Sequence, residues 1–459
     1  MGLVKIIDSK EFFADPGNFL SGRGGNDSEQ AAVYDVVDRI ISAVRSDGDN
    51  AVRRYTEYYD KAVLVNFEVP FLAAREAWEN LSKIEPALAS SLSLAADNIR
   101  RFGELQKEQL ISFESEIKPG IFSGQRVIPV NRAAIYVPAG RFPLISSVLM
   151  GLIPAAVAGV REKLLVSPPR EGGIPDRRIL AAGFIAGADR IFAMGGAQAI
   201  AALALGTETI PRADLIAGPG NKYVAAAKRL LYGEVGIDLV AGPTDVLVIT
   251  DISAGAEYSG CDAANAADLI AESADLIAAD LLAQAEHDPD ACARALVPDM
   301  EMAKQIEAAL AKRLAGLPAA ETARTSLNAG GLIIVYGTRD EAIEAANRIA
   351  PEHLELHVSC TGEWMDGLEN YGSLFIGASA AEVLGDYSAG INHTLPTSGS
   401  ARFTGGLSVR NFLKTVTTLR CDSGKGYAQA LFAAETIARA EGLAGHAESA
   451  ASRINSVKM

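Results

Sequence analysis

Short apolar strands that alternate with helical segments constrain the fold of this chain more than any other feature. Apolar runs at residues 134–137, 163–167 and 190–193 are each followed by a turn or a helical pattern. An order of strand, helix and strand predicts a parallel sheet with helices on both faces, and ligands are expected at the carboxyl ends of its strands. The same alternation returns between residues 302 and 358. The sequence therefore predicts an α/β protein with two Rossmann-like, parallel-sheet domains of related design.

The same patterns divide the chain into a small arm, two domains and a lobe. Residues 1–21 lead into a Gly/Asn-rich loop and are expected to form a small N-terminal arm. Residues 22–134 are largely helical at first, and we expect them to join residues 244–405 in the first α/β domain. Residues 135–243 form the second α/β domain. The final residues, 406–459, become helical again and predict a C-terminal lobe.

The composition favours a soluble globular protein that binds a small molecule. Of 459 residues, 49% are hydrophobic and 22% are charged, and the net charge is -15. A nucleic acid or an anionic membrane surface would repel such a chain, so neither is expected as a partner. The four cysteines lie far apart without a CxxC pair, which favours the cytoplasm. The sequence contains no uninterrupted run of about 18 apolar residues, so no membrane span is predicted.

Glycine-rich turns follow three of the predicted strands in the second domain. They are Pro138-Ala139-Gly140, Gly195-Gly196-Ala197-Gln198 and Gly218-Pro219-Gly220-Asn221. Tyr223 stands where a dinucleotide-binding fingerprint needs Gly or Ala, so the usual nucleotide loop is absent. Each motif alone is explained as a simple turn, but three at one sheet edge allow the close backbone approach that a pyrophosphate requires. An unconventional nucleotide site is therefore expected.

Histidine is scarce in this chain, and most histidines stand beside polar residues. They are His287, His353, His357, His393 and His446. Gln284 and His287 lie three residues apart near a helix end, although alone they could be a polar helix tip. Histidines on separate elements with one carboxylate suit zinc, and Asp386 could supply that carboxylate or be a turn residue. Such a site suggests redox or hydrolytic chemistry on a polar small molecule.

Two of these histidines belong to one predicted strand near residues 354–358. Glu355 and His357 alternate with apolar residues, so we interpret them as the outer face of the strand. His353 shares this parity, and periodicity alone leaves its role open.

Eight ordered motifs make the chain resemble the histidinol dehydrogenase family along nearly its full length. They are Ile135-Tyr136-Val137-Pro138, Gly195-Gly196-Ala197-Gln198-Ala199, Gly218-Pro219-Gly220-Asn221, Gln284-Ala285-Glu286-His287, Pro351-Glu352-His353, Gly385-Asp386-Tyr387, Asn392-His393-Thr394-Leu395-Pro396-Thr397, and Glu441-Gly442-Leu443 with His446. The resemblance implies a zinc- and NAD-dependent enzyme that oxidises a primary alcohol through an aldehyde to a carboxylate. L-histidinol is the expected substrate and L-histidine the expected product.

The resemblance also implies roles for individual residues. His353 is similar to the general base that takes the alcohol proton, and Glu352 to the residue that activates water for attack on the aldehyde. Because neighbours on a regular strand point to opposite faces, we expect a kink at Pro351–His353. The expected NAD contacts are Tyr136, Gln198 and Asn221. The expected zinc ligands are Gln284, His287, Asp386 and His446.

The substrate is expected to contact both the main body and the C-terminal lobe. The expected substrate-binding residues are Thr244, Gln284, His287, His353, Asp386, His393, Glu441 and His446. The family forms homodimers in which the lobe of one subunit completes the site of its partner, so Glu441 and His446 are expected to act in trans. For the metal, the amide of Gln284 is expected to ligate in preference to the neighbouring carboxylate of Glu286.

Some residues depart from the family pattern on the substrate side. Arg141-Phe142-Pro143-Leu144 and Thr244-Asp245 differ from the usual motifs, and the connection at Ser253–Ser273 is longer than usual. These features are similar to sulfopropanediol dehydrogenase, so another polar primary alcohol, such as 2,3-dihydroxypropane-1-sulfonate, is an alternative substrate. From other classes, a zinc hydrolase would keep the metal residues without needing the NAD contacts, and a non-catalytic metal-binding protein is the remaining option.

Overall fold

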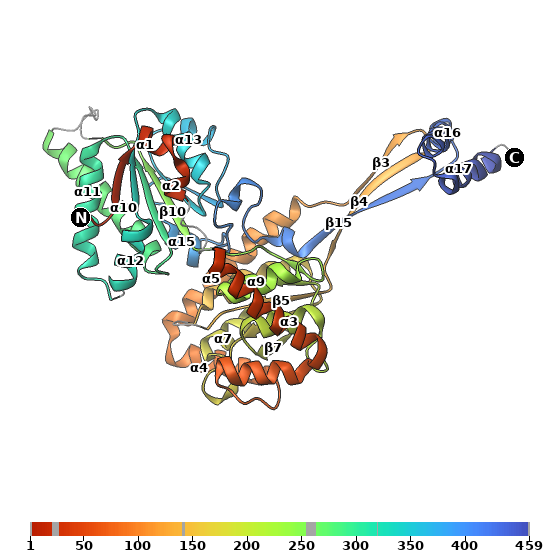
Figure 1. Cartoon of the computed structure of the whole chain (residues 1–459), viewed down its shortest axis with the longest axis horizontal. Coiled ribbons are helices and arrows are strands. Elements are labelled where there is room, and N and C mark those ends of the chain that lie inside the picture. Colours follow the sequence, from red (N-terminus) through yellow and green to blue (C-terminus); the bar gives the residue numbers. More distant parts are fainter. Residues whose placement is uncertain (1, 21–26, 140–142, 254–262, 319, 458–459) are drawn as a thin grey trace.

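The fold consists of two α/β bodies and a long projecting arm. This computed structural model describes residues 2–20, 27–139, 143–253, 263–318 and 320–457. Figure 1 shows each body as a sheet with helices packed on it, and the arm as strands that carry a helical tip. The predicted fold class is confirmed, because both bodies contain mostly parallel sheets and the C-terminus is helical. Most of the expected loop after the first 20 residues, and much of the long connection, lie outside the described residues.

The first sheet, called sheet A, has six parallel strands in the order β1-β12-β11-β10-β13-β14. They are β1 (Lys5–Asp8), β10 (Asp245–Thr250), β11 (Cys292–Val297), β12 (Leu332–Val335), β13 (His353–His357) and β14 (Ser373–Ile376). Neighbouring strands β10 and β13 pair Val246 with His353. The expectation that residues 1–21 form a separate arm is wrong, because the backbone of β1 completes the sheet beside β12.

Helices cover both faces of sheet A. α10, α11 and α12 pack on one face, where Val246 and Val248 belong to the same core as Ile277. α1 and α13 pack on the other face around Leu247 and Leu356. This alternation along β10 buries both faces, as is usual for parallel sheets. The helices of this body are α1 (Ser9–Ala14), α2 (Pro16–Leu20), α10 (Ala263–Ala285), α11 (Met300–Leu314), α12 (Ala320–Gly330), α13 (Arg339–Ile349), α14 (Thr361–Met365) and α15 (Glu382–Tyr387).

The second sheet, called sheet B, has the order β2-β7-β6-β5-β8-β9, with β2 antiparallel to β7 and the other neighbours parallel. Its strands are β2 (Glu68–Val69), β5 (Arg132–Tyr136), β6 (Glu162–Ser167), β7 (Arg190–Ala193), β8 (Leu215–Ala217) and β9 (Gly236–Ile237). The chain runs outward from β5 to β7 and then continues with β8 on the other side of β5. Ligands of open α/β sheets bind at the carboxyl ends of strands where the order reverses, which is between β5 and β8.

The first long helices pack on sheet B, so the predicted grouping of residues 22–134 with residues 244–405 is wrong. α3 shares one core with α8 and α9, and α4 and α5 share another with α6 and α7. Amphipathic periodicity predicts that a helix covers a sheet, but the choice of sheet depends on residues far away in sequence. The helices are α3 (Asp27–Tyr55), η2 (Thr56–Asp60), α4 (Phe71–Ile84), α5 (Pro86–Glu108), α6 (Ile145–Ala158), η3 (Glu171–Gly173), α7 (Arg177–Ala186), α8 (Gly196–Leu205) and α9 (Lys222–Leu231).

The projecting arm joins strands from two distant parts of the chain (Figure 1). β4 pairs in antiparallel fashion with both β3 and β15, and α16 packs against α17 at the tip. The predicted C-terminal lobe is therefore helical at its end, while its first residues form the short helix η5 and the strand β15. The elements of the arm are β3 (Phe113–Lys118), β4 (Ile121–Pro129), β15 (Leu413–Cys421), α16 (Lys425–Ala440) and α17 (Ala444–Val457). The short helix η5 (Val409–Phe412) packs on α5 and α6, and η4 (Ser400–Arg402) lies beside α13. No helix in the described part of the chain is long and apolar enough to cross a bilayer.

Candidate active site

A cavity of about 190 Å³ lies where the two sheets meet. Sheet B contributes residues that follow the carboxyl ends of β5 and β8, including Ser147 and Pro219. Sheet A contributes residues at the amino ends of β10 and β13, including Thr244 and His353. The expected location at the carboxyl ends therefore fits sheet B and is wrong for sheet A. The reason is that the carboxyl edge of one sheet faces the amino edge of the other.

Glu352 and His353 both line this cavity, although they are adjacent in sequence. β13 begins at His353, and Ala350 shortly before it has a left-handed φ of 49°. A non-glycine residue in this conformation bends the chain at a small energetic cost. The bend thus lies at Ala350, one residue before the predicted range. Glu352 precedes the first residue of β13, so strand alternation does not separate its side chain from that of His353.

The carboxylate of Glu352 is buried and held by the start of β10. Oε2 accepts a hydrogen bond from the backbone N–H of Asp245 at 3.1 Å and another from the hydroxyl of Thr244. Burial raises the pKa of Glu352 to about 7. A carboxyl group with a pKa near neutrality can both take up and release a proton at physiological pH.

His353 lies between two further carboxylates. Its Nδ1 is 3.5 Å from Oε1 of Glu382, and its Nε2 is 3.7 Å from Oδ1 of Asp386. Burial opposes a positive charge on the ring, but the carboxylates of Glu382 and Glu352 outweigh it and raise the pKa of His353 well above its usual value. The imidazole can therefore hold a proton that it has removed from a ligand.

Three of the four predicted zinc ligands lie at or beside the cavity. His287 and Asp386 line it, and Gln284 is fully buried at the end of α10. His446 is exposed on α17 at the tip of the arm, far from the other three (Figure 1). Within one chain the predicted ligand set is therefore incomplete.

The side chain of Gln284 has partners on both sides. Its hydrogen-bond pattern directs the amide nitrogen to Oε1 of Glu382, at 2.5 Å, and the amide oxygen to the N–H of Asp245, at 3.0 Å. The neighbouring Glu286 is exposed just beyond the end of α10. Gln284 rather than Glu286 thus reaches the buried side of the site.

The structure also brings together a compact donor group beside the cavity. His353, Glu382 and Asp386 place ligand atoms within 4.8 Å of one another, and of these Asp386 belongs to the predicted zinc set. Nε2 of His353 and Oδ1 of Asp386 are buried and have no hydrogen-bond partner in the part of the chain that the structure describes. Imidazole and carboxylate groups suit a divalent metal ion, so the residues at this cavity fit one.

Glu382 is the site residue that the sequence analysis missed. It is buried at the start of α15 and contacts both His353 and Gln284. Glu382 stands four residues before Asp386, which places the two carboxylates on one helix face. That spacing was the signal in the sequence, but a six-residue helix is too short to show a periodic pattern.

The predicted substrate contacts divide between the cavity and the arm. Thr244 and His393 line the cavity, and Nε2 of His393 is 3.5 Å from Oγ of Ser147. Burial lowers the pKa of His393, which favours its neutral form. Glu441 is exposed at the end of α16, in the arm together with His446. The arm residues therefore do not reach the cavity of their own chain.

The three predicted NAD contacts lie at the carboxyl edge of sheet B. Tyr136 ends β5, Gln198 lies in the first turn of α8, and Asn221 caps α9. The hydroxyl of Tyr136 accepts a hydrogen bond from the N–H of Gly196 at 3.1 Å, and Nε2 of Gln198 donates to Asp60 at 3.2 Å. Tyr136 and Gln198 are buried beneath the turns, whereas Asn221 is exposed.

A buried ion pair holds the turn after β8 against β5. Lys228 and Asp238 form an ion pair. Nζ of Lys228 donates to the carbonyl of Gly218 at 3.0 Å, and the N–H of Gly218 donates to Oδ2 of Asp238 at 2.7 Å. A Cβ at Gly218 would lie 2.0 Å from the carbonyl oxygen of Tyr136, and its φ is +115°. Glycine is therefore required at this turn, which leads into the N-terminus of α9.

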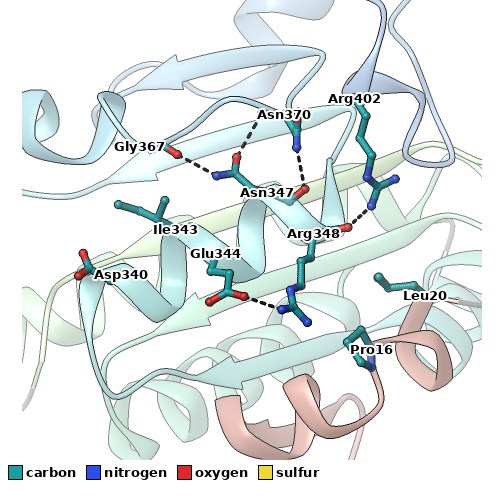
Figure 2. Close-up of a pocket in the computed structure, with 10 residues that line it drawn as sticks. All are labelled: Pro16, Leu20, Asp340, Ile343, Glu344, Asn347, Arg348, Gly367, Asn370 and Arg402. Carbon is teal, nitrogen blue, oxygen red and sulfur yellow. Dashed lines mark hydrogen bonds and ion pairs between the residues drawn. The ribbon is translucent and has the colours of Figure 1, made fainter.

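A second hollow lies away from these residues, on the α13 side of sheet A (Figure 2). It is an open groove of about 730 Å³ between α2 and α13. Asn347 donates to the carbonyl of Gly367 at 2.8 Å, Arg348 pairs with Glu344 at 2.5 Å, and Arg402 donates to the carbonyl of Arg348. These polar groups bond one another, and none of the predicted site residues lines this groove.

These observations define a two-sheet α/β enzyme whose cavity combines an imidazole, buried carboxylates and metal-binding donors. A family model described as "Histidinol dehydrogenase" matches residues 24–454. The chain belongs to the histidinol dehydrogenase family and is accordingly an NAD-dependent oxidoreductase of that type.

Individual proteins of the family are similar to the chain over most of its length. It is 45% identical to histidinol dehydrogenase from Thermus thermophilus over 91% of this chain and 93% of that protein. For histidinol dehydrogenase from Methylococcus capsulatus the identity is 42%, over 94% of this chain and 93% of that protein. The crystal structure of histidinol dehydrogenase from Elizabethkingia anophelis matches all of both chains, with a TM-score of 0.87 and 32% identity.

Proposed function

We propose that the protein oxidises L-histidinol to L-histidine in two consecutive steps, with NAD as the hydride acceptor and one zinc ion in the cavity. The observation that carries this proposal is the convergence of Glu352 and His353 on one cavity beside His287 and Asp386. A base and a second carboxyl group at one cavity can serve two successive steps at the same carbon. The similarity to histidinol dehydrogenases supports the choice of substrate.

In the first step His353 would remove the proton of the alcohol oxygen. NAD, when bound, would supply the acceptor for the hydride that leaves the carbon. The carboxylates of Glu382 and Asp386, which lie against the two ring nitrogens, stabilise the imidazolium that forms. The product of this step is an aldehyde. A cavity walled by two domains keeps that aldehyde bound and away from side reactions.

In the second step Glu352 takes a proton from the water that attacks the aldehyde. The hydroxyl of Thr244 and the N–H of Asp245 both donate to Oε2 and orient the carboxylate. Because burial raises the pKa of Glu352 to about 7, the group can accept this proton and release it later. With NAD bound as the hydride acceptor, oxidation of the resulting aldehyde hydrate would leave the carboxylate product.

Within one chain, Gln284, His287 and Asp386 would hold the zinc ion, and His446 of a second copy would complete the set. A zinc ion bound there would polarise the substrate oxygen and make its proton easier to remove. The buried, unpartnered Oδ1 of Asp386 supports a cation at this place. The neutral amide of Gln284 would leave the ion more electrophilic than a second carboxylate would.

For NAD, the proposed site is the carboxyl edge of sheet B. The N-termini of α8 and α9 meet this edge, and backbone N–H groups at helix N-termini bind phosphate oxygens. Asn221 is exposed there and can contact the cofactor directly. Tyr136 and Gln198 are buried, so they support the turns that the cofactor would touch.

We further propose a homodimer in which the arm of one subunit completes the cavity of the other. The arm carries Glu441 and His446, which do not reach the cavity of their own chain (Figure 1). Leu419 and Phe432 on the arm are 71% and 68% exposed, and apolar side chains gathered on an extended element indicate a protein contact. We also propose a cytoplasmic location, because the four cysteines are scattered along the sequence and do not suggest a disulfide framework.

Another polar alcohol is the second candidate substrate. Leu144 and Thr244, two positions that depart from the family pattern, both line the cavity. The test compares kcat/KM for L-histidinol and 2,3-dihydroxypropane-1-sulfonate through the absorbance of NADH. We expect a preference for L-histidinol of at least about 100-fold. A reversed preference would assign the sulfonate as substrate, and no NADH from either alcohol would favour the zinc hydrolase.

A further inference from the structure

A second cluster of ionisable side chains lies on the face of sheet A that also carries His353. It consists of Glu355 and His357 on β13 and Asp280 on α10. The interpretation of Glu355 and His357 as an outer strand face is wrong, because α10 covers this face and the residues are 0% and 3% exposed. The face of a parallel sheet beneath a helix is normally apolar, as Val246 is on the neighbouring strand.

The polar atoms of this cluster lie close together, but several of them lack a hydrogen-bond partner among the described residues. Nε2 of His357 lies 3.4 Å from Oε2 of Glu355 and 4.0 Å from Oδ2 of Asp280. Oε1 of Glu355 accepts the N–H of Glu382 at 2.7 Å. Among the described residues, Oε2 of Glu355 and both ring nitrogens of His357 are buried without a hydrogen-bond partner. A buried polar atom without a partner costs about 1–3 kcal/mol, so a ligand that engages all three would be stabilising.

The two carboxylates of the cluster favour a bound cation. Asp280 and Glu355 are two carboxylates at close range, and burial together with Glu355 raises the pKa of Asp280 to about 7. Arg313 on the neighbouring helix α11 acts on Asp280 at a distance but is paired with Asp275 at 2.5 Å. Two carboxylates buried at close range repel each other, and a divalent ion between them would offset that repulsion.

We propose that Asp280, Glu355 and His357 form a second metal site, which takes a divalent transition-metal ion such as Zn²⁺ or Mn²⁺. One imidazole and two carboxylates are a donor set that such ions accept. Their ligand atoms already lie within 4.8 Å of one another, and ligands about 2 Å from an ion are about 3–4 Å apart. The side chain of Asp280 is 16% exposed, which gives the ion and a water ligand a route from solvent.

An ion at this site would stabilise residues of the catalytic cavity but would lie outside the cavity itself. The site shares no residue with the predicted zinc set. Glu355 holds the backbone N–H of Glu382, and Glu382 lies against His353. Fixing Glu355 would therefore fix the start of α15 and the carboxylate that faces the proposed base.

The test counts bound metal. Purified full-length protein is stripped of metal, dialysed with Zn²⁺ or with Mn²⁺, and analysed by mass spectrometry of the elements. We expect the wild type to bind one more ion per subunit than His357→Gln. Glu272→Gln is the matched control, because it changes an exposed acidic residue on the same helix, and should bind as many ions as the wild type.

Two further variants keep the result decisive. If His357→Gln does not fold, Asp280→Asn at the partly exposed edge of the cluster should show the same loss of one ion. His287→Ala removes a proposed ligand of the catalytic zinc and should retain the ion that depends on His357. Loss of the catalytic zinc can therefore be distinguished from loss of the ion at the second site. Equal metal content in the wild type, His357→Gln and Asp280→Asn would overturn the proposal and assign a shared proton to the cluster.

Discussion

Asp245 and Glu352 are joined by two reciprocal hydrogen bonds. The N–H of Glu352 donates to Oδ1 of Asp245 at 2.9 Å, and the N–H of Asp245 donates to Oε2 of Glu352 at 3.1 Å. The other carboxylate oxygen of Asp245 pairs with the buried Arg294 at 3.1 Å. These contacts tie the amino ends of β10 and β13 together, and they place the Glu352 carboxylate beside the cavity.

Asp245→Asn should therefore lower both stability and activity. The change leaves the guanidinium of Arg294 buried without its partner charge, which costs about 3–5 kcal/mol in the free energy of unfolding. Urea denaturation measures this loss. Arg75→Met is the control, because it breaks an exposed pair with Glu79 and should cost less than about 1 kcal/mol. Equal costs for the two variants would show that the buried pair is not supporting the site.

Glu352→Gln and His353→Asn should fail at different steps. His353→Asn should slow the first NADH formed from L-histidinol by about 100- to 10,000-fold, because the alcohol proton has no acceptor. Glu352→Gln should slow NADH formation from the aldehyde, supplied directly, by a similar factor. Rapid kinetics with each substrate measures the two steps. Glu286→Gln, at an exposed carboxylate near the cavity, is the control and should change neither step by much. The role assignment fails if both variants lose the same step.

Mixed dimers test whether the arm acts in trans. His353→Ala alters the body and His446→Ala alters the arm, and each homodimer should be inactive. In a mixed dimer with exchanged arms, one cavity combines an unaltered body with an unaltered arm. Co-expression with separate tags, followed by two affinity steps, isolates such dimers, and they should recover about half of the wild-type activity per dimer. Mixed dimers as inactive as the parents would rule out exchange.

Asp60 should make stability depend on pH. Burial raises its pKa to about 6, above the usual 3.8, so the unfolded chain ionises first as the pH rises. The resulting destabilisation is absent below about pH 4, develops up to about pH 6 and persists above it. The free energy of unfolding of Asp60→Asn should therefore exceed that of the wild type by a margin that grows from about pH 4 to about pH 6, reaches roughly 2–3 kcal/mol and stays constant above that pH. Denaturation at several pH values measures the gain. Asp38→Asn, at an exposed site on α3, should show no such trend.

The sequence predicted elements and motifs more successfully than it predicted their partners. The strand–helix alternation from β5 to α9 was correct because it depends on local periodicity. The placement of α3 to α5 on sheet B and of β1 in sheet A could not be predicted, because these contacts join residues far apart in sequence. The same limit applied at the site. Glu352 and His353 were identified from adjacent residues, whereas the role of Glu382 depends on a fold that brings α15 back to β13.

The burial of β13 shows a second limit of periodicity. Alternation of polar and apolar residues correctly grouped Glu355 with His357, but it was read as exposure of the polar face. The structure covers that face with α10, so two acidic groups and an imidazole lie within the protein. A polar strand face is therefore either exposed to solvent or part of a buried site. Which of the two applies depends on whether a helix covers that face.

The ratio of NADH formed to L-histidinol consumed tests the central proposal most directly. Zinc-loaded enzyme is given limiting L-histidinol and excess NAD, and both NADH and L-histidine are measured at completion. We expect two NADH and one L-histidine for each L-histidinol, because His353 and Glu352 serve two successive oxidations at one cavity. One NADH with release of the aldehyde, or no NADH at all, would contradict it.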